Sequence, residues 1–118
     1  METMKENIIK NKSYQFAKEV VLCCQSLIAN REFVISRQLM RSGTAVGALV
    51  REAEMAESKK DFIHKMSIAL KEANETLYWL DLLHDTELLD KKDYLRLHPS
   101  SVELVKILIS IVKSSKSQ

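Results

Sequence analysis

Apolar residues recur every three or four positions along most of the chain, a spacing that predicts amphipathic helices. The first such pattern covers residues 13–29, the second 34–57, and the third runs from 61 to 83 or 84. A fourth pattern covers residues 90–113. Four helices on short connections predict an all-α, up-down-up-down four-helix bundle formed by residues 13–113.

The segments around these patterns predict how the helices begin and end. Ser58 and Asp61 have the spacing of a capping box, so the third helix should start there. Pro99 lies inside the fourth pattern and should either kink that helix or make it restart after His98. The polar segments 1–12 and 114–118 are expected to be a flexible N-terminus and a flexible tail.

Glycine, proline and cysteine usage agrees with a helical core. The 118 residues include only two glycines and one proline, whereas sheet proteins need both residue types at their turns. Gly43 and Gly47 lie four apart in the second pattern, which favours a close approach of two helices over a ligand site. Cys23 and Cys24 are adjacent on a helix, where a bridge would distort the backbone, so we expect two buried, reduced thiols.

Net charge and hydropathy indicate where in the cell the protein is expected to act. The net charge of +2 is too small to indicate nucleic-acid binding by itself. The first twelve residues contain no apolar core of a signal peptide, and no apolar run approaches the ~18 residues of a membrane span. The sequence therefore predicts a cytoplasmic protein that does not enter a membrane.

The fourth pattern has more apolar surface than a bundle helix in a monomer needs. With Val102 placed at 0° and 100° per residue, the residues of its apolar face lie between about 140° and 340° around the helix axis. This arc is about 200° wide, whereas a typical bundle helix needs an apolar arc of somewhat over 100°. Because large exposed apolar patches mark interfaces, we predict a homo-oligomer, with a monomer of unusually apolar surface as the alternative. The expected contact residues are Trp79, Leu104, Ile107, Leu108 and Ile111.

Residues with catalytic or metal-binding chemistry are few. Asp61 and His64 form an acid-x-x-His pair, as do Asp81 and His84, but both pairs lie on one predicted helix about 30 Å apart. No nucleophile elbow or phosphate-binding loop fits glycines at positions 43 and 47 only. We therefore expect no enzymatic activity, no bound metal and no cofactor.

Basic residues offer a further hypothesis. Arginines that repeat along a helix can follow the phosphates of a nucleic acid, although glutamates on the same helix weaken the field. An oligomer would repeat each small cluster several times. The candidate nucleic-acid-binding residues are Arg37, Arg41, Arg51, Lys59 and Lys60.

Several segments resemble a family of four-helix-bundle proteins encoded in intervening sequences of bacterial large-subunit ribosomal RNA genes. The segments that carry the resemblance are Gln38-Leu39-Met40-Arg41-Ser42, Glu52, Asp61-Phe62-Ile63, Ser67-Ile68-Ala69-Leu70 and Glu75. The resemblance covers residues 12–113 and implies an up-down bundle that assembles into a homopentameric ring. A related branch, the accessory variability determinant of diversity-generating retroelements, binds reverse transcriptase and nucleic acid through basic surfaces.

One departure from the family pattern affects the second helix. Many members have Asn-Ile-x-Glu-Gly there, whereas this chain has Leu49-Val50-Arg51-Glu52-Ala53. A mid-helix polar contact is then expected to depend on Glu52 alone, or on Glu52 with Glu75. The resulting hypothesis is a non-enzymatic, oligomeric binding or scaffold protein that associates with structured RNA or a nucleic-acid enzyme. The alternative is a protein–protein interaction module without nucleic-acid binding.

Overall fold

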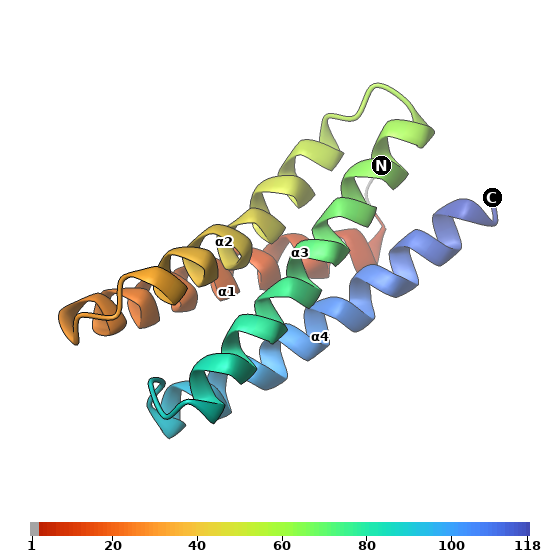
Figure 1. The fold of residues 1–118 in the computed structure, drawn as a ribbon. Coiled ribbons are helices and arrows are strands. Elements are labelled where there is room, and N and C mark those ends of the chain that lie inside the picture. The colour runs from red at the N-terminus through yellow and green to blue at the C-terminus, as the bar shows by residue number, and fades with distance from the viewer. Residues whose placement is uncertain (1–2) are drawn as a thin grey trace.

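The chain forms a four-helix bundle in which successive helices run in opposite directions (Figure 1). The computed structural model describes residues 3–118, and their helices are α1 (Met4–Ala29), α2 (Val34–Glu54), α3 (Lys59–Asp85) and α4 (Lys91–Lys116). α2 packs against α1 and α3, and α4 packs against α3 and α1. The predicted all-α architecture is therefore confirmed.

α1 begins earlier than predicted, at Met4 rather than at residue 13. The Thr3 hydroxyl accepts a hydrogen bond from the Glu6 backbone N–H (3.1 Å), and the Glu6 carboxylate accepts one from the Thr3 backbone N–H. This capping box satisfies backbone donors that the first turn leaves unpaired. Ile9 is fully buried, so residues 4–12 are part of the bundle and the expected start was wrong. Residues 1 and 2 of that segment lie outside the described residues.

The other helix ends follow the sequence signals more closely. The Ser58 hydroxyl accepts from the Asp61 N–H (3.0 Å), which starts α3 as predicted. α2 ends at Glu54 instead of residue 57, and α4 continues to Lys116 instead of 113. Pro99 lies inside α4, which continues on both sides of it, so of the two expected alternatives, a kink or a restart, the restart does not occur.

The core consists of apolar stripes from all four helices. The largest fully buried side chains on α2, α3 and α4 include Leu39, Val46, Val50, Met66, Leu80, Leu83, Leu97, Leu104 and Leu108. α1 and α2 approach closely at both glycines, as predicted. A Cβ atom on Gly43 would lie 2.8 Å from a methyl group of Val20, and one on Gly47 would lie 3.3 Å from the Ser13 carbonyl oxygen.

The apolar arc of α4 serves the bundle itself, which corrects the prediction for three of the five expected contact residues. Leu104, Leu108 and Ile111 are at most 3% exposed and belong to the core of the single chain. Trp79 and Ile107 are partly buried and pack against the same core. The arc is wide because α4 lies between two neighbours, α1 and α3, and needs an apolar surface for each.

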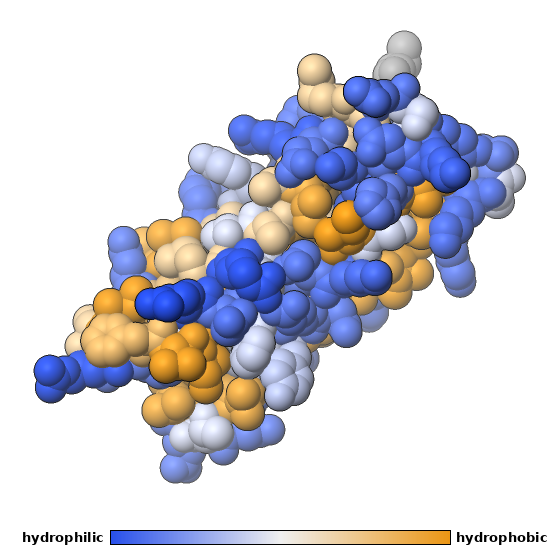
Figure 2. All heavy atoms as spheres, turned by 45° about the horizontal axis from the view of Figure 1, so that its top comes forward, coloured by the Kyte–Doolittle hydropathy of each residue, from blue (hydrophilic) through white to orange (hydrophobic). Residues whose placement is uncertain are grey.

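Large hydrophobic residues nevertheless remain exposed on several helices. Figure 2 shows hydrophobic side chains gathered at the end of the bundle that holds the α1–α2 and α3–α4 turns. Phe33 is 53% exposed, Val34 76% and Leu88 48%. Ile28, Phe33 and Met40 line an open cavity of about 210 Å³ there. None of the helices within residues 3–118 has the length and apolar composition needed to cross a bilayer.

Candidate functional site

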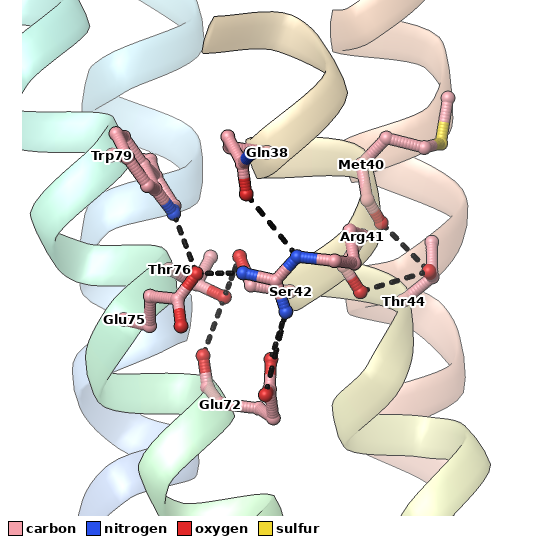
Figure 3. Close-up of polar contacts among 9 residues, drawn as sticks. All are labelled: Gln38, Met40, Arg41, Ser42, Thr44, Glu72, Glu75, Thr76 and Trp79. Carbon is pink, nitrogen blue, oxygen red and sulfur yellow. Dashed lines mark hydrogen bonds and ion pairs between the residues drawn. The ribbon is translucent and has the colours of Figure 1, made fainter.

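Arg41 is the centre of a polar network between α2 and α3 (Figure 3). Its guanidinium forms ion pairs with Glu72 (3.1 Å) and with Glu75, and its Nε donates to the Gln38 side-chain oxygen (3.2 Å). Glu75 also accepts from the indole N–H of Trp79 (2.9 Å). A phosphate would have to compete with two carboxylates for this arginine. The network therefore makes Arg41 a link between helices rather than an available anion site.

A buried hydroxyl pair lies beside this network. Thr76 donates its hydroxyl hydrogen bond either to Ser42 (2.9 Å) or to the Glu72 carbonyl oxygen (2.8 Å), and both hydroxyl residues are fully buried. Buried hydroxyl groups need such partners because their desolvation is otherwise uncompensated. Ser42 thus connects α2 to α3 in the core.

The mid-helix polar contact was expected to depend on Glu52 alone or on Glu52 with Glu75, and in the structure the two glutamates bind different cations. Glu52 accepts a hydrogen bond from the Lys65 ammonium group (3.2 Å), whereas Glu75 pairs with Arg41. Each carboxylate therefore forms an ion pair with a cation on the other helix, and the two carboxylates do not contact each other. The sequence correctly placed these acids between the helices but not their partners.

The structure does not bring the five predicted nucleic-acid-binding residues into one cluster. Arg37 is exposed near the start of α2 and borders the apolar cavity, while Arg51 lies near the other end of α2 and faces α1. Lys59 and Lys60 start α3, and the Lys59 ammonium group donates to the carbonyl oxygen of Gln118. Among the described residues, Arg37 and Arg51 have no acidic partner.

Two of the three histidines, His84 and His98, lie where the end of α3 meets the first half of α4, whereas His64 lies near the start of α3. The Tyr94 hydroxyl donates to Asp81 (2.8 Å), and His98 Nε2 lies 3.5 Å from the same carboxylate oxygen. The ring of His84 stacks on Tyr94 with 3.8 Å between centroids. The hydrogen bond to Asp81 raises the pKa of Tyr94. No group of three or more potential ligands within residues 3–118 is arranged to hold a metal ion.

The cysteines are both free and buried, as the sequence predicted. Burial raises the pKa of the Cys23 thiol to about 12 and that of Cys24 to about 11. The Cys24 sulfur also lies 3.4 Å from the Ser36 carbonyl oxygen, to which the thiol donates. A nucleophilic cysteine needs an accessible thiolate, and these thiols are held protonated in the core.

Sequence reasoning missed one exposed cluster. Tyr14 is half-exposed on α1, and the cations of Lys18 and Arg51 lie 5.1 and 5.5 Å from its ring centroid. The i, i+4 spacing of Tyr14 and Lys18 was a signal that could have been found. The approach of Arg51 depends on how α1 packs against α2, which no local pattern shows.

Comparison with known proteins assigns the chain to a family. Residues 5–110 match the family model of the 23S rRNA-intervening sequence protein. A crystal structure of a protein with unknown function from the S23 ribosomal protein family of Bacteroides thetaiotaomicron is 50% identical, with a TM-score of 0.90. The match covers 93% of this chain and 99% of that chain. No curated protein matches. The four-helix bundle described above, matched over nearly its whole length, thus belongs to the 23S rRNA-intervening sequence protein family.

Proposed function

We propose that the protein is a non-enzymatic, homo-oligomeric binding or scaffold protein of the cytoplasm that associates with structured RNA or a nucleic-acid enzyme. The observation that carries this proposal is the placement of Arg37 and Arg51 on α2, both exposed and without an acidic partner among the described residues. At 100° per residue their side chains point within about 40° of each other, and the helix rise separates them by about 21 Å. Unpaired cations along one side of a helix can contact separate phosphates of one nucleic-acid backbone.

Exposed apolar side chains support the homo-oligomer. Phe33 and Val34 begin α2 with more than half of their surface in solvent, beside the cavity that Ile28 and Met40 help to line. Contiguous exposed apolar surface of this kind favours association. We propose five subunits, the number that the family resemblance implies. A closed ring would repeat the α2 arginines once per subunit and multiply a weak contact.

Light scattering of the full chain, alone and with a structured RNA, tests both parts of the proposal. The expected result is a mass of about five subunits that increases when RNA is added and returns to its original value at high salt. A monomer would refute the oligomer. An oligomer indifferent to RNA would favour a protein–protein interaction module, for which the exposed Phe33 and Val34 provide a contact surface.

Arginine variants test whether RNA binding depends on the arginines that have no acidic partner. Replacing Arg37 or Arg51 by alanine should weaken RNA binding and lower its salt dependence. Arg41→Ala is the matched control, because it removes the same charge from the same helix but from an arginine that already pairs with Glu72 and Glu75. Equal losses in all three variants would contradict a specific role of Arg37 and Arg51.

A further inference from the structure

Tyr14, Lys18 and Arg51 form an exposed aromatic and cationic cluster on the outer face of α1 and α2. Tyr14 is 51% exposed, and Lys18 follows it by one helical turn. Both side-chain cations lie near its ring, at the 5.1 and 5.5 Å given above. At such separations the ring quadrupole attracts the cations and holds them beside the aromatic surface.

The close packing of α1 and α2 builds this cluster. Gly47 approaches the backbone of Ser13 so closely that an added Cβ would lie 3.3 Å from the Ser13 carbonyl oxygen. Tyr14 follows Ser13 on α1, and Arg51 lies one turn beyond Gly47 on α2. The glycine therefore brings the arginine within reach of the tyrosine ring.

The cluster has a positive charge that nearby acids do not neutralise. Among the described residues, no carboxylate lies within ion-pair distance of Lys18 or Arg51. The acids of α1, α2 and the turn between them have other partners. Glu19 pairs with Arg96, Glu32 accepts from the N–H groups of Ile35 and Ser36, Glu52 pairs with Lys65, and Glu54 pairs with Lys10.

We propose that this face of α1 and α2 binds single-stranded nucleic acid, with one base stacked on Tyr14 and neighbouring phosphates paired with Lys18 and Arg51. The inference rests on the proposed function and specifies the strand and the site. Proteins that bind single strands combine aromatic side chains for stacking with cations that follow the backbone. A duplex keeps its base faces stacked inside, and an acidic protein surface would gain nothing from the ring.

The cations over the ring do not prevent stacking. A cation–π contact at an exposed site is weaker than the stacking of a base on an aromatic side chain. Lys18 and Arg51 reach the ring through long, flexible side chains, so they can move to the phosphates while a base covers the ring. In the free protein the same contacts keep both cations close to where the phosphates would lie.

Fluorescence anisotropy with a labelled single-stranded RNA of about 12 nucleotides, a length within the usual site sizes, tests the proposal on the full chain. Tyr14→Ala should weaken binding about tenfold, whereas Tyr14→Phe, which keeps the ring, should bind almost normally. Tyr78→Ala is the control, because Tyr78 is 59% exposed on α3 and no cation lies over its ring in the described part of the chain.

Salt titrations test the phosphate contacts separately. Each of Lys18→Ala and Arg51→Ala should reduce the slope of log affinity against log salt by about 0.7, the value for one phosphate contact of a single strand. Lys106→Ala removes an exposed charge from α4 and should leave most of the slope in place.

The outcomes distinguish this inference from the proposed function. Binding of single-stranded RNA that Tyr14→Ala leaves unchanged, or binding of a hairpin duplex without binding of the single strand, overturns the Tyr14 site and leaves the proposed function standing. Absence of binding to every RNA tested overturns the Tyr14 site together with the RNA-binding part of the proposed function. Circular dichroism of each variant verifies the fold, which a half-exposed position should tolerate.

Discussion

Replacing Gly43 by alanine should destabilise the protein, although alanine favours a helix. In a helix interior alanine is better than glycine by about 1 kcal/mol. At position 43, however, the new methyl group would lie 2.8 and 2.9 Å from the two methyl groups of Val20 on α1. Val20 is fully buried and β-branched, so it cannot rotate away easily. Overpacking of this kind costs about 1–3 kcal/mol, which leaves a net loss of about 1 kcal/mol.

Gly47→Ala is the matched control, one helical turn away on the same helix. The nearest neighbours of its added Cβ would be the backbone and the hydroxyl oxygen of Ser13, at 3.3 Å or more, which is tight but not overlapping. The gain in helix propensity should then offset the strain, and the unfolding free energy should change by less than about 0.5 kcal/mol. The pair of variants separates the effect of steric fit from that of helix propensity.

A double-mutant cycle with Val20→Ala identifies the clashing partner. Alone, Val20→Ala should cost about 2 kcal/mol, because it removes two buried methyl groups and leaves a cavity. Combined with Gly43→Ala, the new methyl group occupies part of that cavity, so the two costs should not add and the coupling should be about 1 kcal/mol or more.

The assay is urea unfolding followed by far-UV circular dichroism, at one protein concentration because an oligomer's stability depends on it. A Gly43→Ala variant that is about 1 kcal/mol more stable than the parent would refute the reasoning. Strict additivity in the double mutant would show that Val20 is not the residue that resists the added methyl group.

The remaining predictions concern the thiols and the start of α1. Because burial raises the pKa of Cys23 and Cys24 to about 12 and about 11, iodoacetamide should modify them at pH 8 only after unfolding, as mass spectrometry would show. The unfolded thiols ionise near pH 9.0 and the folded ones do not, so the unfolding free energy should fall as pH rises from about 9, and less so in a Cys23→Ala/Cys24→Ala variant. Thr3→Ala should cost about 1 kcal/mol in urea unfolding by removing the cap of α1. Glu6→Gln should cost less, since an amide oxygen can still accept from the Thr3 N–H, and equal costs would contradict the capping box.

Local sequence signals were sufficient for most of the fold. The 3.6-residue periodicity predicted each helix, and the capping signal at Ser58 placed the start of α3 correctly. The error at α1 came from a signal that was present but overlooked, since Thr3 and Glu6 have the same spacing as Ser58 and Asp61. After α1 and α3 the chain adopts positive φ angles, at Arg31 (66°) and Glu87 (61°). Glycine is the usual residue at such a position, so its absence here left these two helix ends without their common sequence signal.

The candidate site was less accessible to prediction, because it depends on which residues meet across helices. Arg41 looks like any exposed arginine in the sequence, and only the packing of α2 on α3 gives it two carboxylate partners. Arg51 likewise reaches Tyr14 only because Gly47 permits the close approach of α1.

By itself, the sequence determined the helices, the antiparallel order and the burial of the cysteines, because periodicity, caps and hydrophobicity act within a few residues of each position. Only the tertiary structure decided which apolar residues are buried against a neighbouring helix and which remain exposed to solvent. It buried Leu104, Leu108 and Ile111 between two neighbouring helices, and it left Phe33 and Val34 exposed. An apolar residue's position on a helix shows the direction of its side chain. Whether a neighbouring helix or solvent lies in that direction depends on how the helices are arranged around the core.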